Sequence, residues 1–198
     1  TMVSKLCSYN RRSEFIIKTL THELNTFPNQ QIMILAHQKA LLVYLEKAII
    51  HNNIASVGYY IGGMKEADLK KSESKTVILA TYAMASEGLD IKTLSTLIMA
   101  TPKTDITQSI GRILRVKHSR PLIIDIVDSH EPFERQWEKR KKIYMQNRYV
   151  ITTISSQNYP DGKWEHVRSR SSSKSSSESL GDSGKSKPKK CLINMPFQ

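Results

Sequence analysis

Short apolar runs alternate with helical segments along most of this chain, and this alternation constrains the fold more strongly than any other feature. Strand-length runs occupy residues 31–37, 55–63, 76–81, 95–101 and 121–128. Segments of helical character lie around them, at residues 11–26, 38–53, 64–71, 108–115 and 132–148. Strands that are apolar on both faces are typical of a parallel sheet covered by helices. The pattern therefore predicts an α/β domain in which helices cover both faces of a parallel sheet.

The composition changes after about residue 155. Residues 168–190 consist mainly of serine and lysine, so this segment cannot bury enough apolar surface to offset the entropy lost on ordering. We expect one domain at residues 1–154, closing with a strand near 149–155, and a disordered basic Ser/Lys-rich tail at residues 155–198. Such a tail can bind nucleic acid weakly, accept phosphates on its serines or carry a basic import signal, and a solvated linker is the simplest alternative.

The net charge of +12 is unevenly distributed along the chain. Residues 111–148 carry 10 Lys/Arg against 5 Asp/Glu, and residues 163–198 carry 8 against 3. A positive excess of this kind favours a polyanionic partner, because binding releases the counterions of that partner. The simpler explanation is the solubility of the domain together with a disordered tail.

Several classes of protein do not fit these residues. The two cysteines, Cys7 and Cys191, have no paired spacing for zinc or for a disulfide framework, which favours a reducing, intracellular compartment and indicates no metal site. No apolar run reaches the ~18 residues of a membrane span, and no signal-peptide core is visible, so a membrane partner is not expected. The chain opens in the middle of a pattern, and we expect it to be part of a longer protein.

Polar, basic or glycine residues follow four of the expected strands. Because ligands bind outside the carboxyl ends of the strands in such sheets, these residues are expected to form one functional edge. The candidates are His37, Gln38 and Lys39 after the first run, Gly62, Gly63 and Lys65 after the second, Thr81 to Asp90 after the third, and Thr101 to Asp105 after the fourth.

The stretch "QSIGRILR" places a glutamine, a glycine and two arginines on one short helix. Arg112 and Arg115 are three residues apart and face the same way, with Gln108 one turn before Arg112. Two guanidinium groups of this kind can stabilise the charge that develops on a transferred γ-phosphoryl group. Gly111 lets the helix pack closely against a neighbour or a ligand. The alternative is a basic surface helix whose Ile110 and its apolar neighbours are buried.

The order of these segments resembles a known family. "ILAHQKALLVYLEKAI", "YYIGGMK", "VILATYAMASEGLDI" and "TPKTDITQSIGRILR" are similar to motifs IV, IVa, V and VI of the second RecA-like domain of superfamily 2 helicases, over roughly residues 30–128. DEAD-box RNA helicases usually carry histidine at the position of Gln108, so this motif looks more like the DNA-translocating branch. The residues of motifs V and VI resemble those of the helicases of large cytoplasmic DNA viruses, including their transcript-release helicases, and those of the phage branch-migration helicase.

The resemblance implies a role for each candidate residue. Arg112 would be the arginine finger that reaches ATP across a cleft between two lobes, and Arg115 a second contact to the γ-phosphate, with Gln108 nearby. Gly88 and Asp90 would lie at the ribose, where Asp90 accepts a hydrogen bond from a hydroxyl. The phosphodiester backbone of the tracked strand would be held by Thr81, His37, Gln38, Gly63 and Lys65.

Simpler explanations exist for most of these residues. Asp90 can cap the following turn, Thr81 can be an ordinary strand-end residue, and His37 can be a structural histidine. Lys65 is one of several lysines near surface loops. Residues 134–148, "ERQWEKRKKIYMQNR", are most simply a docked helix with a solvated basic face. No role is assigned to Glu87.

The sequence lacks a G-x-x-x-x-G-K-[ST] phosphate loop and a D-E-x-[DH] acidic pair. Without them the arginines have no phosphate to act on, so this chain alone is not expected to hydrolyse ATP. ATP and Mg²⁺ would be held mainly by an N-terminal RecA-like lobe upstream. The expected function is the C-terminal motor lobe of an ATP-dependent DNA helicase, acting on single-stranded or forked DNA or on an RNA–DNA hybrid.

Two other functions fit the same residues. One is a non-catalytic α/β module that binds nucleic acid, and the other is an RNA helicase lobe of the same superfamily. A viral origin would imply replication or transcription in the host cytoplasm, or packaging in the virion.

Overall fold

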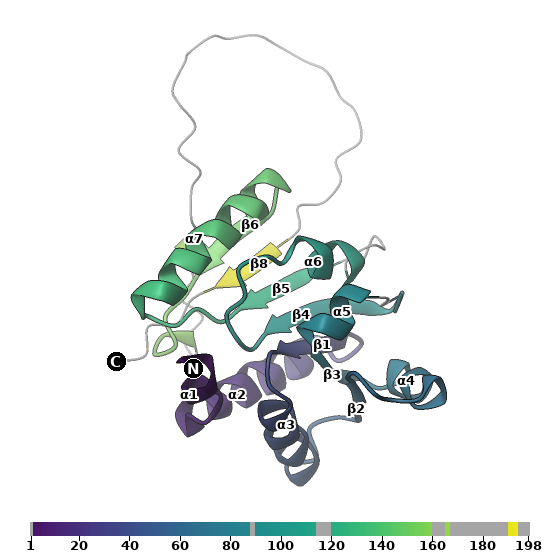
Figure 1. Cartoon of the computed structure of the whole chain (residues 1–198). Helices are drawn as coiled ribbons and strands as arrows, with labels where there is room; N and C mark the ends of the chain where they lie inside the picture. The colour runs from purple at the N-terminus through teal and green to yellow at the C-terminus, as the bar shows by residue number, and fades with distance from the viewer. Residues whose placement is uncertain (1, 88–89, 114–119, 160–164, 167–189, 194–198) are drawn as a thin grey trace, which may run out of the picture.

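The structure, a computed structural model, describes residues 2–87, 90–113, 120–159, 165–166 and 190–193 of the 198-residue chain. In chain order the elements are α1 (Met2–Cys7), α2 (Asn10–Thr26), β1 (Gln31–Ala36), α3 (Lys39–His51), β2 (Val57–Tyr60), α4 (Glu66–Glu73), β3 (Val77–Thr81), α5 (Tyr82–Glu87), β4 (Leu94–Met99), α6 (Thr107–Ile113), β5 (Leu122–Asp125), α7 (Glu131–Gln146), β6 (Val150–Thr153), β7 (Glu165–His166) and β8 (Lys190–Ile193) (Figure 1). The α/β alternation predicted from the sequence is confirmed.

The strands form one sheet in the order β2-β3-β1-β4-β5-β8-β6-β7. The first five strands of this order are all parallel, as predicted. β1 lies in the middle of these five, where Met33 has Ile78 of β3 on one side and Leu97 of β4 on the other. The carboxyl ends of β1 to β5 therefore meet at the same edge of the sheet.

Helices cover both faces of the sheet because every central strand is apolar on both sides. In β1, Met33 and Leu35 pack into one hydrophobic cluster, while Ile32 and Ile34 pack into another. Successive side chains of a strand point to opposite faces, which explains this alternation. The first cluster is closed by α4, α5, α6 and α7, and the second by α1, α2 and α3. Figure 1 shows α5, α6 and α7 on the side of the sheet that faces the viewer.

Local sequence signals set the ends of several elements. α2 ends at Thr26 because Phe27-Pro28 follows, and α7 begins with Pro132 in its first turn, where the missing backbone N–H is tolerated. β2 ends at Tyr60 rather than at residue 63, since Gly63 has a backbone φ of +87° that a strand cannot use. Two helices of six residues, α1 and α5, were not predicted.

The packed part of the chain extends beyond the predicted boundary at residue 154. Tyr159 is 5% exposed, and its ring contacts Phe15 and His22 of α2 at centroid distances of 5.3 and 5.4 Å. Within the predicted tail, β8 pairs with β5 and β6, and β7 pairs with β6. The run "KCLI" of β8 is apolar but short, so the serine-rich composition around it hides its strand character. The remaining tail residues lie outside the described part of the chain.

Candidate functional site

The polar residues that follow the strands lie at the carboxyl edge of the sheet. His37 and Gln38 come directly after β1, Gly63 and Lys65 come after β2, and Thr81 is the last residue of β3. His37, Gly63 and Lys65 are exposed, while Gln38 and Thr81 are half-buried. Because these strands are parallel neighbours, the five residues share one edge that is open to a ligand.

His37 is held against the segment that follows β4. Its backbone N–H donates to Oγ1 of Thr101 at 3.0 Å, and its Nδ1 lies 2.9 Å from the same oxygen. The His37 ring lies 4.7 Å from the ring of Tyr82. Although His37 is exposed as a residue, partial burial of its imidazole lowers the pKa of His37 below its ordinary value, and the positive charge of Lys103 lowers it further. At neutral pH His37 is therefore an uncharged hydrogen-bonding group at this edge.

The other candidates at the ends of β1 and β2 differ in how they are engaged within the chain. The Gln38 side-chain amide donates to Oγ of Ser4 in α1 at 2.6 Å, so it already forms a hydrogen bond within the chain. Lys39 Nζ donates to the carbonyl oxygen of Gly62 at 3.3 Å and links the two strand ends. Lys65 is exposed at the start of α4 and presents its charge to solvent.

Position 63 requires a glycine because of its backbone conformation and not because of close packing within the described part of the chain. Its φ of +87° lies in the region that L-residues rarely adopt, and a Cβ placed there would meet no atom within 4 Å. The loop between β2 and α4 therefore brings a backbone without a side chain to the open edge. Such a turn lets a phosphate group come close to the main chain.

The two faces of α6 have opposite character. Ser109 and Ile110 are buried against the sheet, whereas Gln108 and Gly111 are exposed. A Cβ at Gly111 would meet nothing within 4 Å, so the close packing expected there does not occur against the described part of this chain. The open face of α6 is therefore available to a ligand or to another domain.

For three of the candidate residues the structure describes the backbone alone or nothing. The backbone of Arg112 belongs to α6, but its side chain lies outside the described atoms, and Arg115 and Gly88 lie outside the described residues. Asp90 is described and exposed. Ile110 is 7% exposed, which agrees with the alternative of a surface helix that buries its apolar side.

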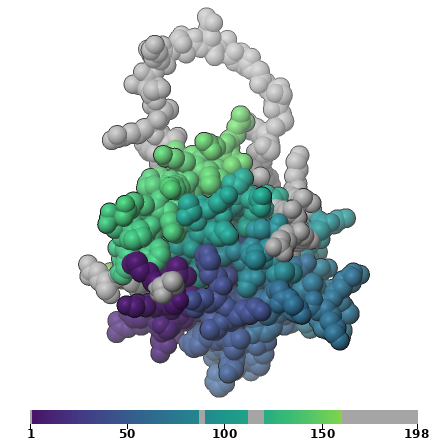
Figure 2. All heavy atoms as spheres, viewed as in Figure 1, coloured from purple at the N-terminus to yellow at the C-terminus, as the bar shows by residue number. Residues whose placement is uncertain are grey.

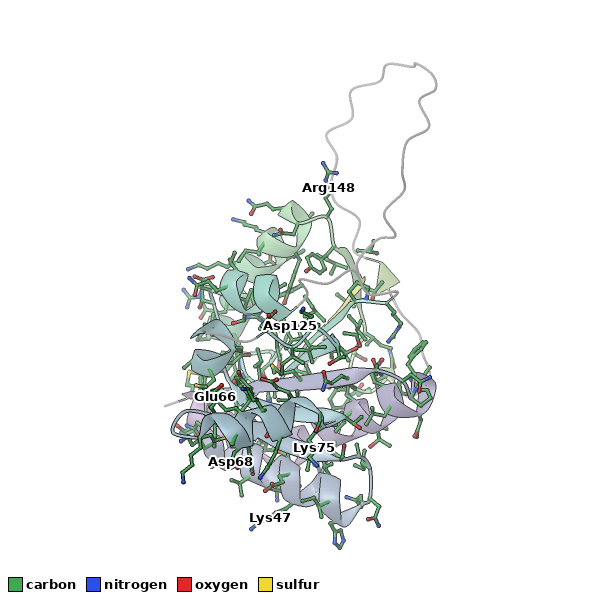
Figure 3. The ribbon with its side chains drawn as sticks, turned by 90° about the vertical axis from the view of Figure 1, so that its right-hand side faces the viewer. Lys47, Glu66, Asp68, Lys75, Asp125 and Arg148 are labelled. Atoms are coloured by element: carbon green, nitrogen blue, oxygen red, sulfur yellow. The ribbon has the colours of Figure 1, made fainter. Side chains whose placement is uncertain are left out.

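Two buried arginines at this edge were missed by the sequence analysis. Arg12 of α2 donates to both carboxylate oxygens of Asp128 at 2.7 and 3.0 Å. Arg140 of α7 donates to both carboxylate oxygens of Asp125 at 2.6 and 2.9 Å, and the hydroxyl of Tyr144 donates to the same carboxylate. Figure 3 shows Asp125 in the interior of the molecule. The segment expected to be a docked helix with a solvated basic face thus also contributes a buried charge to the core.

A sequence signal for the second pair was present. Phe133, Trp137, Arg140 and Tyr144 recur at the spacing of one helix face, and Asp125 interrupts an otherwise apolar strand. An arginine on the apolar side of a helix and an acidic residue in a buried strand together predict an ion pair, because neither charge is stable in a core alone.

The match to known families defines the class of this domain. The model of the helicase conserved C-terminal domain matches residues 15–117, which is more than half of the chain. The chain therefore belongs to the helicase C-terminal domain family, in superfamily 2, and the resemblance seen in motifs IV to VI is confirmed.

Relatives in large DNA viruses share its sequence. A protein of Acanthamoeba polyphaga mimivirus, provisionally described as an ATP-dependent RNA helicase, is 39% identical over 155 residues, which is 76% of this chain and 30% of that protein. A similarly described protein of African swine fever virus is 30% identical over 106 residues, covering 52% of this chain and 21% of that protein. The chain thus spans less than a third of the length of these relatives.

Solved structures show the same fold at low sequence identity. T4 UvsW superposes with a TM-score of 0.56 at 17% identity, covering 73% of this chain and 34% of that one. The C-terminal part of the Fun30 ATPase domain superposes with a TM-score of 0.54 at 12% identity, covering 63% and 43%. The similarity to viral proteins therefore rests on the relatives found by sequence, and these structures support the fold alone.

Two residues that the resemblance assigns to the nucleotide, Gln108 and Asp90, are described and exposed. Gln108 and Gly111 are exposed on α6, and Asp90 is exposed on the segment that precedes β4. The buried side of α6 is fixed by Ile106 and Ile110, so the helix can turn its polar side outward without losing its packing. The polar side of α6 is therefore exposed in the described part of the chain.

Proposed function

We propose that this chain is the C-terminal lobe of an ATP-dependent nucleic-acid translocase. The observation that carries the proposal is the arrangement of the carboxyl edge: His37, Gly63, Lys65 and Thr81 follow or end strands at this edge, and the chain runs from the same edge into α6, whose Gln108 and Gly111 face outward. Membership of the helicase family supports a function in ATP-driven movement on nucleic acid. The viral relatives favour an intracellular site of viral replication or transcription.

The lobe would complete an ATP site that lies mainly on an N-terminal RecA-like lobe. ATP, bound there with Mg²⁺, supplies the γ-phosphoryl group whose presence distinguishes the closed from the open state. The guanidinium groups of Arg112 and Arg115 would stabilise the negative charge on that group, with Gln108 one turn away. Gly88 and Asp90 would lie at the ribose, where the carboxylate of Asp90 accepts a hydrogen bond from a hydroxyl.

The strand ends would hold the phosphodiester backbone without reading the bases. Lys65 adds a positive charge, Gly63 allows the backbone to come close, and Thr81 offers a hydroxyl donor. His37 is uncharged at neutral pH, so it would donate a hydrogen bond rather than form an ion pair. Gln38 would take part only by giving up or sharing its bond to Ser4.

We propose DNA as the nucleic acid, in single-stranded or forked form or paired with RNA. The residue at position 108 supports this choice, because glutamine there resembles the DNA-translocating branch. The descriptions of the mimivirus and swine fever virus relatives name RNA helicases, and this favours RNA as the second candidate. Competition between forked DNA, duplex RNA and an RNA–DNA hybrid of the same sequence for the whole protein distinguishes the two.

The decisive experiment measures nucleic-acid-stimulated ATP hydrolysis by the whole protein that contains this lobe. Arg112→Ala should lower turnover about 10³-fold or more, the scale expected for loss of an arginine finger. Lys47→Ala is a matched control, since it removes one exposed positive charge on α3, away from the carboxyl edge (Figure 3). Turnover by Arg112→Ala near that of the wild type would refute the nucleotide half-site and leave a binding module.

A further inference from the structure

The short linker between β4 and α6 is fixed by side chains and backbone from four separate elements. It comprises Ala100 to Lys103, and residues 104–106 separate it from α6, the helix that carries Gln108 and Arg112. Its hydrogen-bond donors are the Arg12 guanidinium to Ala100 O, the His37 N–H to Thr101 Oγ1 at 3.0 Å, the Tyr82 hydroxyl to Thr101 O at 2.6 Å, and the Arg140 guanidinium to Lys103 O at 2.9 Å. Residues of α2, of α5 and of α7, and His37 after β1, thus all hold the linker that precedes α6.

Tyr82 makes one of these bonds and also touches two of the other residues involved, His37 and Lys103. It follows Thr81 directly, at the start of α5, and it is 2% exposed. One side of its ring contacts the imidazole of His37 at 4.7 Å, and Nζ of Lys103 lies 5.2 Å from its centroid. Its hydroxyl holds the main chain of the linker. Tyr82 therefore touches one candidate backbone-binding residue, follows another in the chain, and fixes the entry to α6.

A second connection runs from the same residue to the middle of α6. The hydroxyl of Ser86 donates to the carbonyl oxygen of Tyr82 at 2.8 Å, and it lies 3.2 Å from the hydroxyl of Ser109. Ser109 is 2% exposed on the buried side of α6. Figure 2 shows the teal segments adjoining the green ones on this face of the molecule. α6 is thus connected to α5 at its entry and again along its length.

We propose that Tyr82 is a positioning residue that couples contact with the nucleic-acid backbone at the ends of β1 and β3 to the placement of α6. This rests on the proposed function. The physical basis is that both residues bond to Thr101. Its side-chain hydroxyl oxygen is bonded to His37, and its carbonyl oxygen accepts from the hydroxyl of Tyr82. A ligand that moves His37 or Thr81 must also move the Tyr82 ring or strain these bonds. The linker transmits that displacement because it is bonded at three of its four residues.

Tyr82→Phe isolates this role because it keeps the buried ring and removes only the hydroxyl. Arg12 and Arg140 are unsuitable, since removing either leaves a buried carboxylate without its partner and threatens the fold. Tyr60→Phe is a matched control. Tyr60 lies on β2 in the same hydrophobic cluster, and it is not among the partners of the linker in the described part of the chain.

The first measurement is ATP hydrolysis by the whole protein with saturating nucleic acid. Tyr82→Phe should lower kcat about two- to ten-fold, the range set by one net hydrogen bond, with KM for ATP and affinity for nucleic acid within about two-fold of wild type. In a His37→Ala background the same change should have little further effect, because the coupled contact is already lost. An unchanged kcat, or an additive double variant, would overturn the proposal.

The second measurement needs only this chain, and uses amide hydrogen exchange with a single-stranded oligonucleotide. In the wild type and in Tyr60→Phe, oligonucleotide binding should slow exchange in residues 100–111. In Tyr82→Phe the oligonucleotide should bind with the same affinity without slowing exchange there. Equal slowing in Tyr82→Phe would overturn the coupling while leaving the proposed function intact. No binding by the wild-type chain would remove the backbone contact itself, and the coupling with it.

Discussion

The guanidinium of Arg140 and the carboxylate of Asp125 form a two-bond ion pair, at 2.6 and 2.9 Å, that is almost completely enclosed. Arg140 comes from α7 and Asp125 from the end of β5, so the pair fixes a helix on the sheet at its functional edge. The third donor of the guanidinium reaches Lys103 O, in the linker before α6. One buried pair therefore joins the stability of the domain to the geometry of its candidate site.

Arg140→Met should lower the free energy of unfolding by about 3–5 kcal/mol, because it leaves the Asp125 carboxylate buried without its counterion. Urea denaturation of this chain measures the loss. Arg135→Met provides the control, since Arg135 lies on the same helix in an exposed pair with Glu131, and it should change stability by less than about 1 kcal/mol.

The double variant Arg140→Met with Asp125→Leu tests the cause of that loss. It should recover part of the stability, because no unpaired charge then remains in the core. A single variant as stable as the wild type would show that the bond already donated by the Tyr144 hydroxyl is enough to hold the Asp125 carboxyl group without the Arg140 charge.

The sequence was sufficient to predict the parallel strands and the edge at which their carboxyl ends meet, because both depend on local patterns. Runs such as residues 76–81 are apolar on both faces, and the polar residue that ends each run must lie at the edge where the strand ends. The pairing of Arg12 with Asp128 depends on packing between segments 116 residues apart, and no local pattern specifies it. Helix α5 was missed because six residues are too few to establish a periodicity.

The candidate site shows the same division. The positions of His37 and Thr81 followed from the strands, but their connection through Tyr82 to the linker did not. Gln38 was expected to face a ligand, and its amide instead donates to Ser4 of α1, a helix that the sequence did not reveal. Local sequence patterns thus predicted the individual elements but not the side-chain contacts between them.

The lowered pKa of His37 gives a specific pH dependence. Burial of the ring disfavours the protonated form in the folded state, so the unfolded chain binds the proton more tightly. This stabilising contribution is present above the ordinary pKa of 6.5 and is lost as the pH falls from there through the lowered pKa of the folded state. His37→Asn, which keeps a polar atom near Thr101, should flatten this part of the profile.

Thermal melts of the wild type and His37→Asn between neutral and mildly acidic pH measure the difference. The comparison is needed because carboxylates also titrate toward the acid end of this range. A difference in stability that does not vary with pH would show that the imidazole titrates normally, and direct observation of its titration by NMR would then give an unshifted pKa.

Lys65→Ala should weaken binding of single-stranded nucleic acid to a similar extent for all base sequences. A lysine that contacts a phosphate releases about one counterion on binding, so the slope of log K against log salt should also fall by about one. Fluorescence anisotropy at several salt concentrations measures both effects, with Lys47→Ala as the control on α3. Weaker binding of one base sequence only, or an unchanged slope, would contradict a contact to the backbone.

Gly111→Ala separates the stability of this lobe from its proposed contact with a second lobe. Gly111 is exposed inside α6, and the space where a Cβ would lie is open. In this chain alone the variant should be more stable by about 0.5–1 kcal/mol, because alanine favours the helix and glycine does not. In the whole protein the same methyl group would lie where α6 approaches the nucleotide, so ATP turnover should fall although the lobe is more stable. Denaturation of the chain and ATP hydrolysis by the whole protein give the two values. A gain in stability with unchanged turnover would place the exposed side of α6 in solvent, away from the interlobe cleft.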